Sequence, residues 1–143
     1  MKFSAKTNYG IVALLELAAE FPGGGVLQIA QIACRQEIPE RYLEQMMTSL
    51  RKGGLLRSIR GPRGGYQLTR SPAQITIAEV LNCLEREELS ENIVKSPSPE
   101  FLALNALAAG VKQKQVEYLE AISLQDLLEE CDKYIKDQTM YFI

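Results

Sequence analysis

The chain has 143 residues, a formal net charge of −2, three cysteines and no histidine. This length suits one domain with an appended helix and is too short for two full domains. The chain has no run of about 18 apolar residues and no secretory signal, so we expect a cytoplasmic protein. Its dispersed cysteines form neither a disulfide framework nor a metal knuckle, so we expect reduced and mostly buried thiols.

Three helices are predicted in the first part of the chain. Ser4 is a candidate N-cap for a helix that continues to about Phe21, where one proline and three glycines follow at residues 22–25. A second helix is expected over residues 28–36 and a third over residues 40–52, separated by a turn that contains Pro39. The order of the second helix, turn and third helix predicts a helix-turn-helix.

The third predicted helix has one apolar stripe and one polar face. Its apolar residues recur at helical spacing, at positions 43, 46, 47 and 50. In a helix-turn-helix the polar face reaches base edges, where arginine suits guanine, glutamine suits adenine and glutamate accepts from cytosine. The candidate residues on this helix are Arg41, Tyr42, Glu44, Gln45 and Arg51. A solvated helix face would have the same composition, so the helix alone leaves both interpretations open.

A basic hairpin is predicted over residues 55–68. Two short runs of alternating apolar and polar residues flank a tip that holds three glycines and Pro62. An arginine at such a tip can enter the minor groove, where the phosphates focus negative potential. The candidate DNA contacts here are Ser58, Arg60, Gly61 and Arg63. Next to a helix-turn-helix, this hairpin predicts the wing of a winged-helix domain, whereas alone it could be an ordinary solvated hairpin.

The charge is divided unevenly along the chain. Residues 1–71 hold 10 Lys and Arg against 5 Asp and Glu, a net charge of +5, whereas residues 72–143 hold 6 against 13, a net charge of −7. Between Arg41 and Arg70, seven basic residues accompany one acidic residue, Glu44. A local basic surface favours phosphate binding, because neutralised phosphates release condensed counterions. The whole-chain charge therefore does not argue against nucleic acid as a partner.

The second half of the chain is predicted to begin with a short helix and a linker. Thr76 and Glu79 form a capping box that opens a helix to about residue 85. The acidic, serine- and proline-containing residues 85–99 read as a flexible linker.

Two further helices are predicted after the linker. A long helix is expected over residues 100–122, and Ser123 caps a shorter one with Leu127, Leu128, Cys131 and Ile135 on its inner side. The apolar stripe of the long helix is too long for so small a domain to cover, which favours pairing with a second copy. The candidate dimer contacts are Leu104, Leu107, Val111 and Leu119.

These motifs together resemble the Rrf2 family of bacterial transcriptional regulators. The resemblance is carried by residues 42–45, 50–55 and 60–68, and it extends from the N-terminus through residues 122–127. It implies a homodimer of two winged helix-turn-helix domains that binds a palindromic operator. By their match to the family motif, Tyr42, Glu44 and Gln45 take major-groove positions and Arg60 is the wing arginine. Two further matches, Lys6 and Tyr9, take positions that contact the DNA backbone.

The chain departs from this family in its cysteines. Iron-sulfur members carry three closely spaced cysteines in the linker, and residues 85–99 here contain none. We therefore expect no metal or other cofactor, with a [2Fe-2S] cluster held by atypical ligands as the alternative. A signal would then enter through a protein partner, through a small ligand between the wing domain and the long helix, or through oxidation of an exposed thiol. Cys34, which precedes Arg35, is the redox candidate, and Cys83 is expected to be structural.

The predicted fold is mainly α with a small β-hairpin wing, divided into a winged helix-turn-helix domain at 1–85, a linker at 86–99, and a dimerisation helix with a C-terminal helix at 100–143. The predicted function is sequence-specific binding to double-stranded DNA by a transcriptional regulator, with repression as the expected mode. A protein-interaction module on the same scaffold, using the apolar tail at 140–143, is the alternative. An enzyme is not expected, because the chain lacks histidine, a phosphate-binding glycine loop and a nucleophile beside a plausible base.

Overall fold

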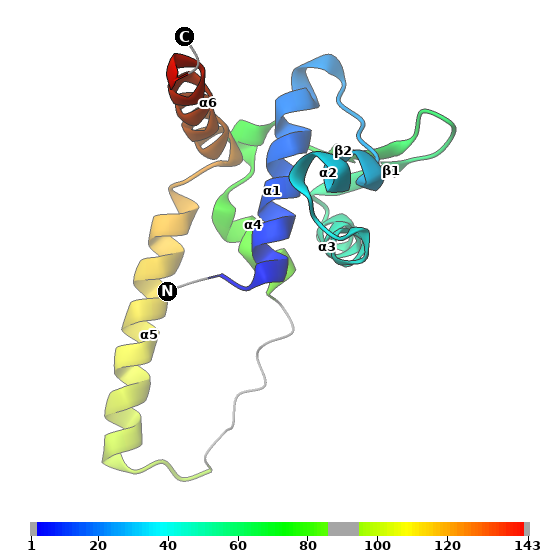
Figure 1. Ribbon diagram of the computed structural model, residues 1–143. Coiled ribbons are helices and arrows are strands. Elements are labelled where there is room, and N and C mark those ends of the chain that lie inside the picture. The colour runs from blue at the N-terminus through cyan, green and yellow to red at the C-terminus, as the bar shows by residue number, and fades with distance from the viewer. Residues whose placement is uncertain (1–2, 86–94, 142–143) are drawn as a thin grey trace.

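A computed structural model describes residues 3–85 and 95–141, with side chains described through residue 138 (Figure 1). Residues 86–94 of the predicted linker and residues 142–143 of the apolar tail lie outside the described residues. Within the described part, no helix has the length and apolar character that a membrane crossing needs. The α-helices and β-strands in chain order are α1 (Ala5–Glu20), α2 (Ile29–Gln36), α3 (Glu40–Lys52), β1 (Leu56–Ile59), β2 (Gly65–Leu68), α4 (Ile77–Leu84), α5 (Pro99–Glu120) and α6 (Leu124–Tyr141).

Helix starts follow the predicted caps. The Ser4 side chain accepts a hydrogen bond from the Thr7 backbone N–H at 3.2 Å. Thr76 and Glu79 cap each other reciprocally at 3.1 and 3.0 Å, which confirms the predicted capping box. Ser123 and Asp126 cap each other in the same way at the start of α6. Each cap satisfies backbone N–H groups that have no acceptor inside their own helix.

The core lies where α1, α2, α3, the hairpin and α4 meet. Its fully buried side chains include Leu14 and Leu17 of α1, Ile32 of α2, and Leu43 and Leu50 of α3. Each stabilises the fold by roughly 1.5–3 kcal/mol on leaving water. Because α3 buries the predicted apolar stripe, its polar face must turn outward, away from α1.

The start of α6 also belongs to this core, so the predicted division at residue 100 does not separate two packing units. Leu124 is fully buried, and its backbone N–H donates to the Ile75 carbonyl at 2.8 Å. The Ile77 N–H in turn donates to the Ile122 carbonyl at 2.9 Å. Local sequence signals could not reveal this, because the two segments meet only through tertiary packing. The prediction that Ile135 faces inward is wrong, because its side chain is 60% exposed.

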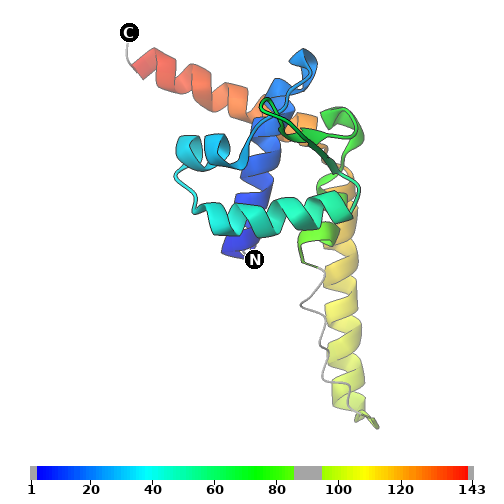
Figure 2. The same ribbon diagram turned by 90° about the vertical axis from the view of Figure 1, so that its right-hand side faces the viewer.

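Helix α5 projects away from the domain, as Figures 1 and 2 show. Only its C-terminal end packs beside α4, where Leu119 contacts the core of its own chain. All residues from 99 to 114 are exposed. The long helix therefore offers an apolar surface that the described residues of this chain do not cover.

Candidate nucleic-acid interface

The exposed face of α3 carries most of the predicted base-reading residues. Arg41, Glu44 and Gln45 are exposed, and Tyr42 is half-buried. The hydroxyls of Thr48 and Ser49 donate to the carbonyls of Glu44 and Gln45 at 2.8 and 3.1 Å. These bonds use backbone acceptors only, so within the described part of the chain the Glu44 carboxylate and the Gln45 amide remain available to base edges.

An aromatic stack stands at the N-terminal end of α3. The ring of Tyr9, from α1, stacks on that of Tyr42 with centroids 6.1 Å apart and an interplanar angle of 27°. The Arg41 guanidinium carbon lies 4.9 Å from the Tyr42 ring centroid. Arg41 also donates from Nη2 to the Tyr42 hydroxyl oxygen at 3.1 Å. Tyr42 thus contacts two other predicted contact residues, Tyr9 on one side and Arg41 on the other.

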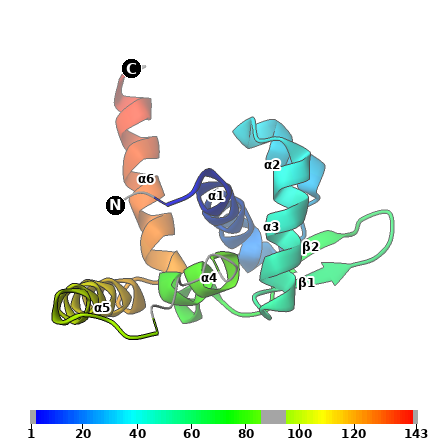
Figure 3. The same cartoon turned by 90° about the horizontal axis from the view of Figure 1, so that it is seen from below.

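The hairpin stands beside α3 and projects from the side of the domain away from α5 (Figure 3). Its strands pair antiparallel, with Leu56 opposite Leu68 and Ile59 opposite Gly65. The base of the hairpin is tied to the segment before α2, because Leu27 and Tyr66 exchange backbone hydrogen bonds of 2.8 and 3.0 Å. The wing therefore has a fixed base.

The tip of the hairpin is exposed. Gly61 adopts a φ of +110°, which favours glycine, and its carbonyl accepts from the Gly64 N–H at 2.9 Å. Ser58, Arg60 and Arg63 are all exposed around this turn. The tip thus presents its guanidinium groups to solvent, as the prediction of a wing requires.

The basic groups of this surface form no ion pair with another described residue. Arg35 and Arg70, elsewhere in the domain, pair with Glu16 at 3.0 Å and Glu79 at 3.2 Å. Among the described residues, no carboxylate lies within 4.0 Å of the basic groups on α3 and the hairpin. These groups are Arg41, Arg51, Lys52, Arg57, Arg60 and Arg63. Lys6 is likewise exposed and lines the same groove as Glu44 and Gln45. Such a surface suits a polyanion whose phosphates supply the missing negative charge.

The cysteines lie on three different helices. Cys34 is exposed on α2, so the expectation that the thiols are mostly buried is wrong for this residue, which faces away from the core. The neighbouring Arg35 is already paired with Glu16. Cys83 is half-buried beside Gly53, where a Cβ atom would overlap its sulfur. This contact at the end of α3 was not predicted, because it joins residues far apart in the sequence.

The donor set does not fit a resident iron-sulfur cluster. No group of three or more histidine, cysteine, aspartate or glutamate side chains comes together in residues 3–85 and 95–138 in a way that could hold a metal ion. The chain offers three cysteines and no histidine, whereas a [2Fe-2S] centre is ordinarily held by four thiolates.

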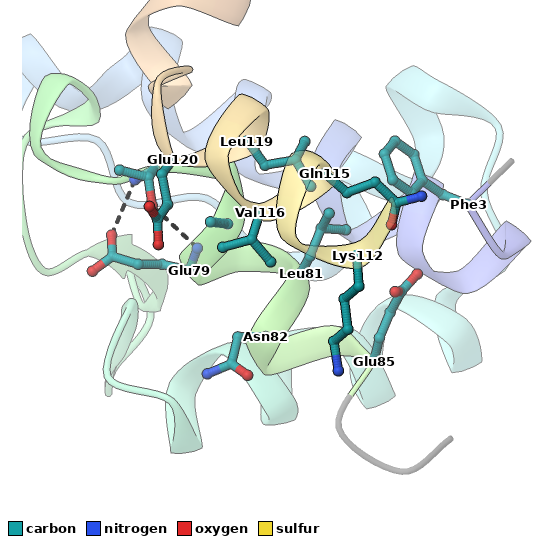
Figure 4. Close-up of a pocket in the computed structure, with 12 residues that line it drawn as sticks. Phe3, Glu79, Leu81, Asn82, Glu85, Lys112, Gln115, Val116, Leu119 and Glu120 are labelled. Atoms are coloured by element: carbon teal, nitrogen blue, oxygen red, sulfur yellow. Dashed lines mark hydrogen bonds between the residues drawn. The ribbon is translucent and has the colours of Figure 1, made fainter. Parts of the chain in front are cut away.

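A cleft of about 480 Å³ lies between α4 and α5, where the sequence placed a candidate small-ligand site. Its apolar floor is formed by Leu81, Val116 and Leu119, with Glu79 and Glu120 at one end and Glu85 at the other (Figure 4). Its size falls within the usual range for ligand pockets. Leu119, predicted as a dimer contact, is therefore part of an intramolecular site rather than of the exposed surface of α5.

The other predicted dimer contacts are exposed on α5. Leu104, Leu107 and Val111 are 57%, 65% and 51% exposed. Together with the aromatic ring of Tyr118, also on α5, they form an uncovered apolar surface, which we call the α5 face. A contiguous exposed apolar surface of this kind is typical of an interaction site.

Comparisons with known proteins agree with this architecture. The Rrf2 family model, described as iron-dependent transcriptional regulator, matches residues 3–130. The HTH-type transcriptional regulator CymR of Bacillus subtilis is 33% identical over 132 residues, which cover 92% of this chain and 93% of the relative. The solved structure of T. potens IscR has a TM-score of 0.75 and 34% identity, covering 94% of this chain and 90% of that one. The structure of CymR from B. subtilis has a TM-score of 0.74 at 32% identity, covering 91% and 98%.

Proposed function

This chain belongs to the Rrf2 family, and we infer that it is a DNA-binding transcriptional regulator rather than an enzyme. We propose that it acts as a repressor and binds a palindromic operator as a homodimer. In this arrangement α3 enters the major groove and the hairpin tip enters the adjacent minor groove. The observation that carries the proposal is the group of exposed basic side chains on α3 and the hairpin, which have no carboxylate partner among the described residues. We also propose that the protein acts in the cytoplasm, because its proposed partner is DNA.

The homodimer rests on the α5 face. Burying Leu104, Leu107 and Val111 against a second copy removes from water an apolar surface that the described residues of this chain do not cover. A two-fold axis through paired α5 helices gives two symmetric DNA-binding domains, which would read half-sites about 34 Å apart. Occupation of such a site by both domains would exclude other proteins from that DNA, which is the basis for proposing repression.

The experiment that tests this function is selection of binding sites from random duplex DNA by the full chain. We expect a palindromic consensus, a stoichiometry of two chains per duplex, and an affinity that falls steeply with salt concentration because phosphates are neutralised. Transcription from a promoter carrying the selected site should then fall on addition of protein. Recovery of sites without sequence preference would refute the function, and single half-sites bound by one chain would refute the dimer.

For the signal, we propose a route that needs no resident cofactor. The cleft between α4 and α5 supports a small-ligand effector, since it combines an apolar floor with carboxylates at its ends. A protein partner and oxidation of the exposed Cys34 are the other two routes to be tested. Protein purified without oxygen should lack iron, sulfide and visible absorption, and stoichiometric iron and sulfide would overturn this part of the proposal.

A further inference from the structure

The stack at the N-terminal end of α3 joins the folded core to the DNA-facing surface. Tyr9 is half-buried on α1, Tyr42 is half-buried on α3, and Arg41 is exposed beside it. Helices α1 and α3 contact each other, and both contribute buried side chains to the core, such as Leu14 and Leu43. The ring of Tyr9 therefore packs against the core on one side and stacks on the Tyr42 ring on the other. The Tyr42 ring in turn contacts Arg41, a candidate base-reading residue.

We propose that Tyr9 is a positioning residue whose ring, through Tyr42, holds the Arg41 guanidinium ready to read a base, and that it is not a phosphate contact. The inference rests on the proposed function, because it concerns how α3 selects its site. It assigns to Tyr9 a role in base specificity, whereas a hydroxyl on the DNA backbone would add affinity for any sequence.

The physical reason is pre-organisation of a long side chain. An unsupported arginine loses rotamer freedom when it docks on a base, and that loss opposes binding. Here the Tyr42 ring lies 4.9 Å from the guanidinium carbon, and the Tyr42 hydroxyl accepts from Nη2 at 3.1 Å. A guanidinium has five N–H donors, so enough remain for bidentate contact with guanine.

Arg41 differs in this respect from the other arginines of the surface. The Arg41 guanidinium lies over an aromatic ring of this chain. Arg60 and Arg63, by contrast, are exposed at the hairpin turn. A wing arginine that enters the minor groove reads groove width and potential, for which a mobile side chain suffices. Bidentate reading of a base edge requires a fixed guanidinium plane, which the stack supplies.

The test compares two variants of Tyr9 in the full chain on the selected operator. Tyr9→Phe keeps the ring and removes the hydroxyl, and we expect its affinity and base preference to stay within about twofold of wild type. Tyr9→Leu removes the stack, and we expect roughly tenfold loss of discrimination at one base-pair position in each half-site, the lower end of what a bidentate contact supplies. The slope of log affinity against log salt should not change in either variant, because no phosphate contact is lost.

Two further variants act as controls. Lys6→Ala should weaken binding equally on all sequences and reduce the salt slope by about one phosphate contact, which is the behaviour Tyr9 should not show. In an Arg41→Ala background, Tyr9→Leu should cause no further loss of discrimination, because the side chain that it positions is absent. Tyr42→Phe, which removes the acceptor of the Arg41 hydrogen bond, should lose part of the discrimination at the same position as Tyr9→Leu.

Several results would overturn the inference. Tyr9→Phe losing affinity on all sequences with a reduced salt slope would show that the hydroxyl contacts a phosphate. Full discrimination in a folded Tyr9→Leu variant would show that the stack does not position Arg41. If Tyr9→Leu does not fold, the Tyr42→Phe variant decides the question, and unchanged discrimination there refutes the inference. Failure of the wild-type chain to select any sequence would instead refute the proposed function itself.

Discussion

Gly65, at the start of β2, is a position where one added methyl group should separate the wing from the rest of the domain. Its φ is +152°, and a Cβ built there would lie 2.7 Å from the Leu27 carbonyl carbon and 3.0 Å from the Gln28 nitrogen, with the Leu27 oxygen nearer still. These are backbone atoms and cannot rotate away. Gly65→Ala should therefore separate the hairpin from the segment before α2, where Leu27 and Tyr66 exchange two hydrogen bonds.

The magnitude follows from two contributions. A positive φ for a residue with a Cβ costs about 1–3 kcal/mol. Loss of the two Leu27–Tyr66 hydrogen bonds adds about 0.5–1.5 kcal/mol each. The sum for Gly65→Ala is about 2–6 kcal/mol, a large part of the roughly 5–15 kcal/mol that stabilises a typical domain.

Gly61→Ala is the matched control. Gly61 has a φ of +110°, but nothing lies within 4 Å of an added Cβ, so this variant carries the backbone strain without the collision. We expect Gly65→Ala to be less stable than Gly61→Ala by about 1–3 kcal/mol, the contribution of the two hydrogen bonds. Urea unfolding followed by circular dichroism, at one protomer concentration for all variants, measures the difference. Equal unfolding free energies for the two variants would refute the reasoning.

Four further outcomes are expected. Arg60→Ala should weaken operator binding by about 1–3 kcal/mol, most on sites with a narrow A·T minor groove, and equal affinity at equal salt in fluorescence anisotropy would contradict the wing assignment. Gln45→Ala should relax selection at one base-pair position in a repeated site selection, whereas an unchanged consensus would remove Gln45 from base reading. Leu107→Lys should give monomers by sedimentation, because it places charge in the proposed α5 interface; a variant dimer as tight as wild type would exclude this face. If Cys34 carries the signal, an oxidant should change the operator affinity of the wild-type protein and not that of a Cys34→Ser variant. The same change in affinity in both proteins would exclude Cys34 as the sensor.

The parts of the fold that could be predicted from the sequence are those with local causes. Ser4, the Thr76 and Glu79 pair and Ser123 each act on backbone groups within three residues, so their helices begin where the caps predict. The apolar stripe of α3 and the glycine-rich tip are also local patterns, and both were found in the expected order.

The features that escaped prediction depend on which distant segments meet. Leu124 is buried because it reaches the segment before α4, and Leu119 turns toward α4 instead of toward the exposed side of α5. The polar face of α3 was predicted residue by residue, but the stack of Tyr9 on Tyr42 was not, since it requires α1 and α3 to cross at one point. Periodicity gives the inward side of a helix; it does not give the partner that covers that side.

The two backbone hydrogen bonds that join residues 75–77 to residues 122–124 have a mechanical consequence. They join the turn after α5 to the segment that leads into α4, so α5 is a lever whose C-terminal end is attached to the DNA-binding domain. With 22 residues at 1.5 Å each, the lever is about 33 Å long. If the N-terminal end of α5 is fixed and the helix tilts by about 10°, the domain attached to its C-terminal end moves by about 6 Å. That displacement is close to the width of a minor groove. Small changes in how two such levers cross would thus be magnified into changes in the distance between recognition helices.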